Sequence, residues 1–242
     1  MSSTSEVGHA KNVANLQKIT KQVTTYDLYN PPVENITIAS LQVLYTNAKA
    51  KLTEVENKRL ANKNAITVRQ SNFENLKSIC TRIVNLLDIL DLPQGTIDQA
   101  RSLNRSIQGS SKKTTTPPEE GKEAPKTSST SRQSFTQQAE NFGILLQLLK
   151  TLPNYTPNED DLKLVNLTAY HASLVSATEN VDQTESQLTT KMIERNKMLY
   201  AENTGLYTIA QNIKKYVKST YGANSPEYTT VSAIKFTEPK SS

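Results

Sequence analysis

The chain has no tryptophan, one cysteine and two histidines among its 242 residues. The single cysteine, Cys80, excludes an intrachain disulfide. Its place in an apolar helical series (residues 76, 79, 80 and 83) predicts a small buried side chain rather than a reactive thiol. One cysteine and two histidines, His9 and His171, cannot build a Cys/His zinc site. We expect His171, at a core position of a predicted helix, to make an interhelical hydrogen bond.

The sequence also lacks the short motifs of common enzyme classes. No Gly-x-Gly-x-x-Gly, Walker-type Gly-Lys-Ser/Thr or Gly-x-Ser-x-Gly occurs, so phosphate-cradling loops and nucleophile elbows have no support. The paired Glu-x-x-His motifs of di-iron bundles are missing. We interpret Glu159, Asp160 and Asp161 as an acidic helix start, capped by Thr156 or Asn158. These absences predict no enzyme, no cofactor, no metal and no small-molecule substrate.

Charge and hydrophobicity are both moderate. The net charge of +5 comes from 28 basic residues interspersed among 23 acidic ones, whereas a nucleic-acid face clusters its basic residues. The most apolar run, Ile144–Leu149, is far shorter than the roughly 18–20 residues that span a bilayer. The N-terminus has no hydrophobic signal core. We therefore expect a soluble, cytoplasmic protein, and both a nucleic-acid and a membrane partner are disfavoured.

Helical periodicity dominates the chain. Residues Val33–Leu92 contain neither glycine nor proline, and apolar residues recur there at steps of three and four, as in a heptad pattern. One continuous helix of about 60 residues would be about 90 Å long; a hairpin is the alternative. The polar core positions Arg59, Asn62 and Arg69 favour a bend near the middle. Pro93 and Gly95 predict its end.

The two halves of the sequence align with each other. Residues 12–103 match residues 138–230 at a nearly constant spacing of 126. The aligned pairs are Asn15/Asn141, Leu16/Phe142, Ile19/Leu145, Val23/Leu149, Tyr29/Tyr155, Pro31/Pro157, Leu41/Leu167, Val55/Val181, Arg69/Arg195, Phe73/Leu199 and Ile83/Ile209. The shared Tyr-x-Pro corners indicate a duplicated helical unit.

Composition divides the chain into five segments. Residues 104–133 are rich in Ser, Thr, Pro and Lys and hold almost no large apolar side chain, so they predict a flexible linker. The expected order is a disordered start (1–10), a first helical unit (11–103), this linker (104–133), a second helical unit (134–236) and a disordered tail (237–242). The predicted fold class is all-α: an elongated, coiled-coil-like helical bundle of two pseudo-repeated units.

Local signals divide the second half further. The tripeptide Asn203–Gly205 predicts a kink, and Gly222 predicts a helix end. Ser225 followed by Pro226 predicts the start of a short final helix. The string Lys215-Tyr-Val-Lys-x-x-Tyr-Gly-x-x-Ser-Pro-Glu-Tyr-x-x-Val-x-x-Ile-Lys-Phe resembles the C-terminal signature of an uncharacterised family of bacterial helical-bundle proteins. The resemblance implies a helical bundle and brings no activity. The first half lacks this string: it has Pro93-Gln-Gly-Thr-Ile-Asp at the corresponding end.

The basic C-terminal region is the only candidate interaction site. It combines lysines with aromatic residues, a mixture that can stack on single-stranded nucleic acid or simply pack the last helix. The candidate residues are Lys214, Lys215, Lys218, Tyr221 and Tyr228.

The leading hypothesis is a non-enzymatic structural or protein-interaction protein whose partner is another copy of itself or a second helical protein. The alternatives are a pore-forming-like, membrane-active helical protein and a nucleic-acid-binding module that uses the basic region.

Overall fold

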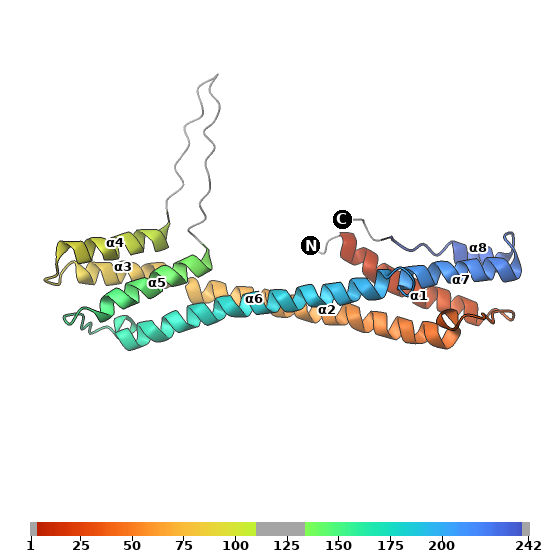
Figure 1. Cartoon of the computed structure of the whole chain (residues 1–242), viewed down its shortest axis with the longest axis horizontal. Coiled ribbons are helices and arrows are strands. Elements are labelled where there is room, and N and C mark those ends of the chain that lie inside the picture. Colours follow the sequence, from red (N-terminus) through yellow and green to blue (C-terminus); the bar gives the residue numbers. More distant parts are fainter. Residues whose placement is uncertain (1–3, 110–133, 239–242) are drawn as a thin grey trace, which may run out of the picture. The chain divides into compact units, whose positions relative to one another are not determined.

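The computed structural model describes residues 4–109 and 134–238, and this part of the chain consists of helices and loops without β-strands (Figure 1). The α-helices are α1 (Thr4–Thr24), α2 (Ile38–Phe73), α3 (Leu76–Leu87), α4 (Gln94–Gln108), α5 (Phe135–Lys150), α6 (Leu164–Tyr200), α7 (Leu206–Tyr221) and α8 (Pro226–Ser232). Two 3-10 turns, η1 (Glu34–Ile36) and η2 (Asp160–Leu162), precede α2 and α6. The predicted all-α fold class is confirmed.

The helices form two compact units that do not coincide with the predicted helical units 11–103 and 134–236. The terminal unit combines the described parts of residues 1–62 and 184–242, and the middle unit comprises those of 63–183. Each unit takes one portion of α2 and one of α6, so each mixes both sequence halves. The physical reason is that a helix buries its apolar face against whichever helix lies beside it, and sequence proximity does not decide that neighbour.

The core of the terminal unit lies between α1 and α7. Four apolar residues of α1 are at most 3% exposed (Val13, Leu16, Ile19 and Val23), and they pack in one cluster with Ile209, Ile213 and Val217 of α7. The start of α2 runs antiparallel to the end of α6 in this unit. Lys58 donates to Gln187 at 2.8 Å, and Thr184 donates to Asn62 at 3.0 Å.

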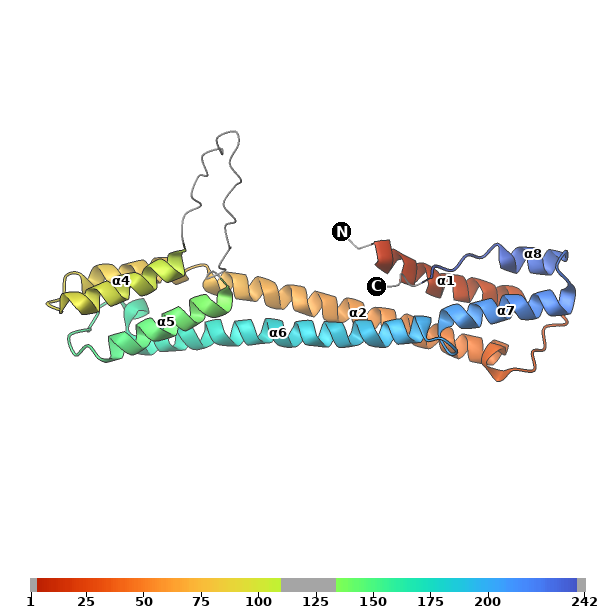
Figure 2. The same cartoon turned by 45° about the horizontal axis from the view of Figure 1, so that its top comes forward.

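Four helices supply most of the core of the middle unit. Cys80 and Ile83 of α3, Ala100 of α4 and Phe142 of α5 are all fully buried, together with Leu174 of α6. Figure 2 shows α4 and α5 side by side in this unit. Burial raises the pKa of the Cys80 thiol to about 12, so the thiol is protonated and inert, as its apolar surroundings predicted.

Both Tyr-x-Pro corners are built in the same way. The Tyr29 hydroxyl donates to the carbonyl of Ile36 at 2.7 Å, and the Tyr155 hydroxyl donates to the carbonyl of Leu162 at 2.9 Å. Both rings are nearly buried, and burial raises the pKa of Tyr155 to about 12. Each tyrosine therefore ties the chain after a first helix to the turn that starts the long helix.

The two corner hydroxyls should contribute equally to stability. Tyr29→Phe and Tyr155→Phe each leave a buried carbonyl without its donor, which costs about 1–2 kcal/mol. Urea unfolding followed by circular dichroism measures the loss for each variant and for the pair. A loss in only one variant would show that the corners are not equivalent.

Positions 126 residues apart are buried in both halves. The pairs in which both side chains are less than 9% exposed include Asn12/Gln138, Val13/Ala139, Leu16/Phe142, Ile19/Leu145, Thr20/Leu146, Val23/Leu149, Tyr29/Tyr155, Ile36/Leu162, Leu41/Leu167, Ala48/Leu174, Val55/Val181 and Phe73/Leu199. The turns η1 and η2, and the first residues of α2 and α6, have the same spacing. The two halves thus place their side chains in the same pattern.

The interruption in the first long helical segment is not where the polar core positions predicted it. Helix α2 continues through Arg59, Asn62 and Arg69 and ends at Phe73. These positions tolerate helix because each has a partner: Arg59 pairs with Glu56, Asn62 accepts from Thr184, and the Arg69 guanidinium lies 4.4 Å from the centre of the Phe135 ring. The break falls at residues 74–75, where α3 begins after Asn75.

Residues 104–108 belong to a helix and not to the predicted linker. Pro93 is the N-cap of α4, and Gly95 lies inside this helix, which continues to Gln108. Its buried face is sparse (Ile97, Ala100 and Ile107), which is why the periodicity did not reveal it. The rest of the predicted linker, residues 110–133, lies outside the described part of the chain.

The described terminal residues are ordered where disorder was predicted. Helix α1 starts at Thr4, and His9, 7% exposed, lies 2.7 Å from the hydroxyl of Tyr200. At the other end, the side chain of Asn12 donates to the carbonyl of Thr237 at 2.9 Å and accepts from its N–H at 2.8 Å. The two predictions of terminal disorder were wrong for these residues because they did not include contacts between distant parts of the sequence. Residues 1–3 and 239–242 lie outside the described range.

Most local signals in the second half are confirmed. Helix α6 stops at Tyr200, Gly205 precedes α7, and Gly222 ends α7 with a φ of 96°. The Ser225 hydroxyl caps α8 by accepting from the N–H of Tyr228 at 3.1 Å.

The predicted N-cap of the second long helix is wrong. Helix α6 begins at Leu164, and neither Thr156 nor Asn158 caps it. The acidic residues form ion pairs instead, Asp160 with Lys163 at 2.6 Å and Asp161 with Arg82.

Candidate interaction surfaces

Lys214, the first residue of the candidate basic site, holds the C-terminal segment in place. Its ammonium donates to the carbonyls of Ser232 and Ile234 and lies 5.4 Å from the centre of the Phe236 ring. Burial, and then the charge of Lys235, lower the pKa of Lys214. This lysine therefore serves the packing of the terminal unit.

The other candidates lie nearby on α7 and α8, and most are also engaged within the terminal unit. The Lys218 ammonium lies 5.6 Å from the centre of the Tyr228 ring. The Tyr221 hydroxyl accepts from the N–H of Leu28 at 2.8 Å, and its ring lies 5.5 Å from that of Tyr26. Lys215 is exposed. The region thus brings the five predicted residues together, but four of them make contacts that position α8 and neighbouring loops.

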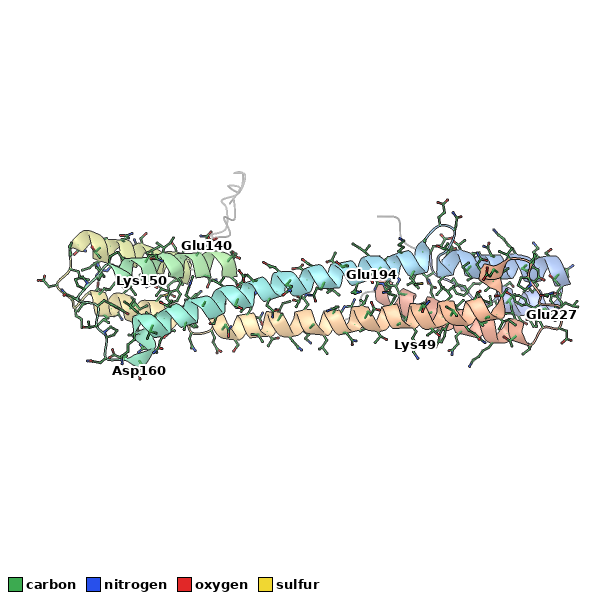
Figure 3. All side chains as sticks on the ribbon, turned by 60° about the horizontal axis from the view of Figure 1, so that its bottom comes forward. Lys49, Glu140, Lys150, Asp160, Glu194 and Glu227 are labelled. Carbon is green, nitrogen blue, oxygen red and sulfur yellow. The ribbon has the colours of Figure 1, made fainter. Side chains whose placement is uncertain are left out.

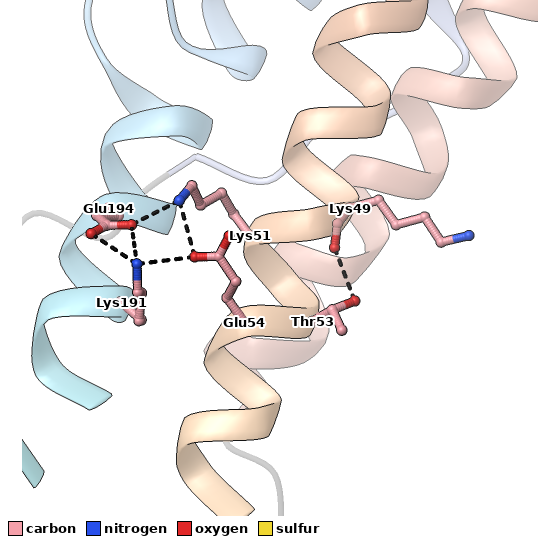
Figure 4. Close-up of polar contacts among 6 residues, drawn as sticks. All are labelled: Lys49, Lys51, Thr53, Glu54, Lys191 and Glu194. Carbon is pink, nitrogen blue, oxygen red and sulfur yellow. Dashed lines mark hydrogen bonds and ion pairs between the residues drawn. The ribbon is translucent and has the colours of Figure 1, made fainter. Parts of the chain in front are cut away.

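A second charged group lies where α2 and α6 run side by side in the terminal unit. Lys51 and Glu54 of α2 alternate with Lys191 and Glu194 of α6 (Figure 4). The four nitrogen–oxygen distances are 3.0 Å (Lys51–Glu54), 2.8 Å (Lys51–Glu194), 3.2 Å (Lys191–Glu54) and 2.9 Å (Lys191–Glu194). Hydrogen bonds from both ammoniums lower the pKa of each carboxyl, and the carboxylates raise the pKa of each ammonium.

This ion-pair cluster should make unfolding pH-dependent on the acid side. Because the folded-state pKa of Glu54 and of Glu194 lies below the usual carboxyl range, the cluster stabilises the fold above that range, and the contribution is lost as pH falls through the folded pKa. Urea unfolding at neutral pH and at successively lower pH should show this loss.

The double variant Lys51→Met/Lys191→Met should flatten the acid-side dependence. Lys49 points away from the cluster (Figure 4), so Lys49→Met is the matched control and should retain the dependence. An identical pH profile for all three proteins would contradict the assignment.

An apolar surface depression lies in the middle unit, between α5 and α6. We call it the α5/α6 groove, and its volume is about 640 Å³. Its lining residues are Thr136, Ala139, Glu140, Gly143, Ile144, Leu146, Gln147 and Lys150 of α5 and Thr168, His171, Val175, Thr178, Glu179 and Asp182 of α6. Ile144 is 50% exposed and lines the groove.

His171 forms the floor of the groove and joins its two walls. Its Nε2 lies 3.1 Å from the carbonyl oxygen of Ala139, which makes the predicted interhelical hydrogen bond. A Cβ on Gly143 would lie only 2.8 Å from this nitrogen. The missing side chain at Gly143 therefore lets the imidazole lie directly against α5.

The terminal unit has a groove at the matching positions with a different chemistry. It lies between α1 and α2, has a volume of about 390 Å³, and is lined by Gln17, Thr20, Lys21, Thr24, Gln42, Tyr45 and Thr46. Residues 126 positions apart differ in kind: Lys18, Thr20 and Lys49 stand where the α5/α6 side has Ile144, Leu146 and Val175. Because the same helical framework accommodates a polar groove, the fold does not require the apolar lining.

Comparison with protein-family models, with curated proteins and with solved structures finds no match to this chain. The resemblance of its C-terminal string to a bacterial family stays a prediction. Within residues 4–109 and 134–238, no three potential metal-ligating side chains gather. In the same ranges, no helix combines the length and the apolar character needed to cross a membrane.

Proposed function

We propose that this chain is a non-enzymatic protein-interaction module, built from two copies of one helical unit, that binds a helix of its partner in the α5/α6 groove. The observation that carries the proposal is the apolar α5/α6 groove at positions where the α1/α2 groove is polar. Exposed apolar surface beside a cavity is a common mark of an interaction site. The matching burial of positions 126 residues apart supports the duplication.

The shape of the groove favours a helical occupant. Two helices form its walls, and a third helix that lays an apolar stripe between them completes a three-helix packing. The lining from Thr136 to Lys150 spans 14 residue steps, about 21 Å at 1.5 Å per step. That length suits about four helical turns, each of which can bury one or two apolar side chains.

Site-specific photo-crosslinking in cells of the native host tests the proposal. A benzophenone amino acid at position 144 should yield adducts with a protein, and sequencing of the attached peptide should show apolar residues at helical spacing. The matched control has the same amino acid at position 18, the corresponding place in α1, and should yield none. Absence of protein adducts at position 144, or equal adducts at both positions, would refute the proposal.

The remaining sequence hypotheses gain no new support. Four of the five basic-region residues make contacts within the terminal unit, so the nucleic-acid hypothesis rests on the exposed lysines Lys215 and Lys218. A cytoplasmic location stays part of the proposal.

A further inference from the structure

We infer that the occupant of the α5/α6 groove is an amphipathic helix with basic residues in its first turns, lying parallel to α5. The inference rests on the proposed function and adds the chemistry and the direction of the partner. It comes from the distribution of charge along the groove.

Charge is separated along the groove. Glu140, from an early turn of α5, and Glu179 and Asp182, from the facing portion of α6, line one end and are exposed. Lys150, in the last turn of α5, lines the other end. Figure 3 shows Glu140 and Lys150 toward opposite ends of α5. A bound helix thus meets three carboxylates at one end and one ammonium at the other.

Two physical effects then fix the direction of the occupant. The N-terminus of a helix carries partial positive charge and its C-terminus partial negative charge. Lysine or arginine near the N-terminus of the occupant complements the three carboxylates, and a carboxylate near its C-terminus complements Lys150. Both effects place the N-terminus of the occupant beside Glu140, which makes it parallel to α5 and antiparallel to α6.

Two helices in the described part of the chain already have partners for their apolar faces. The apolar faces of α1 and α7 are buried against each other in the terminal unit, at Leu16 and Ile213 among others. Residues 110–133 are too polar to fill an apolar groove. A helix of a second protein is therefore the occupant that the chemistry fits.

Designed peptides test the inference on the intact chain. The forward peptide has 16 residues, an apolar stripe at i, i+4, i+7 and i+11, three lysines in its first turns and two glutamates in its last. The reversed peptide has the same composition with the two charged ends exchanged. Fluorescence anisotropy at low salt should show that the forward peptide binds about tenfold more tightly. The reversed peptide either meets like charges at both ends of the groove or turns around and opposes its helix dipole to the charges of the groove.

Variants of the protein locate the binding. Ile144→Asp should weaken the forward peptide by about tenfold or more, because it places a charge in the apolar contact. Lys18→Asp, at the corresponding position of α1, is the matched control and should leave binding unchanged. Because Glu140 is retained, Glu179→Lys/Asp182→Lys gives both ends of the groove a net positive charge, so the preference for the forward peptide should be lost.

Each other outcome overturns the inference in a recognisable way. Equal binding of the two peptides, lost in Ile144→Asp, would remove the direction and keep the proposed groove. Self-association detected by light scattering and abolished by Ile144→Asp would make a second copy the occupant. Preference for anionic vesicles over both peptides would replace the protein partner by a membrane surface. No binding of either peptide, together with no photo-adduct at position 144, would refute the proposed function as well.

Discussion

Replacing Gly205 by alanine should destabilise the protein by about 3 kcal/mol, since an inserted atom in tight packing forces the backbone to move. A Cβ at this position would lie 2.5 Å from the backbone nitrogen of Ala201, 2.6 Å from its carbonyl oxygen and 2.8 Å from the carbonyl carbon of Tyr200. All three are backbone atoms, so no side-chain rotation relieves the clash. The Gly205 N–H also donates to the Ala201 carbonyl at 2.8 Å, and this turn joins α6 to α7.

Urea unfolding followed by circular dichroism measures this effect, and Gly95→Ala is the matched control. A Cβ on Gly95 meets nothing within 4 Å, and Gly95 lies inside α4. Alanine there should leave stability unchanged or raise it by up to about 1 kcal/mol, because glycine is the weaker helix former. Equal stability of Gly205→Ala and Gly95→Ala would show that the α6–α7 turn relaxes freely.

The sequence predicted a kink near Gly205 but not that this position requires glycine. The tripeptide around it predicted a kink, which is confirmed. Its φ of −69° and ψ of 149° are accessible to any residue, so the turn conformation does not demand glycine. Glycine is required because backbone atoms at the end of α6 lie very close to Gly205, and only the folded structure shows this proximity.

Helices with regularly spaced apolar residues were predicted from the sequence, and a helix with few apolar residues was not. Regular apolar spacing located α2, α6 and α7, and Leu41 and Leu167 are fully buried as the spacing requires. Helix α4 was missed because its buried positions are few and its sequence is mostly polar. The composition of the compact units was also missed, since periodicity says which face is buried and not against which helix.

The candidate sites also depend on contacts between distant parts of the chain, which the sequence does not show. The basic C-terminal region was recognised from local composition, but the partners of Lys214 and Tyr221 come from elsewhere along the chain and give these residues structural roles. The α5/α6 groove needs the proximity of residues 30 or more positions apart, such as Gly143 and Val175. One local signal was available: Ile144–Leu149 is apolar where the corresponding stretch from Lys18 to Val23 is more polar.

Replacing Phe142 by alanine should cost about 3–5 kcal/mol, the usual range for loss of a buried phenylalanine. Phe142 is fully buried in the middle unit, with its ring centre 5.8 Å from that of Tyr170 and 6.0 Å from that of His171. Phe142→Leu should cost less, since a leucine, Leu16, occupies the corresponding position of α1 and is equally buried there. Urea unfolding measures the loss for both variants. A loss below about 1 kcal/mol for Phe142→Ala would mean that the surrounding core collapses to fill the space.

The contrast between Phe142→Ala and Ile144→Asp separates folding from binding on one helix. Ile144 lies two residues after Phe142 and is 50% exposed, so it is not part of the buried core. Ile144→Asp should therefore change the free energy of unfolding by no more than about 0.5 kcal/mol. Its effect should fall on peptide binding instead. A large loss of stability in Ile144→Asp would show that this side chain serves the core of the middle unit, and the groove would then lack the exposed apolar edge on which a partner helix depends.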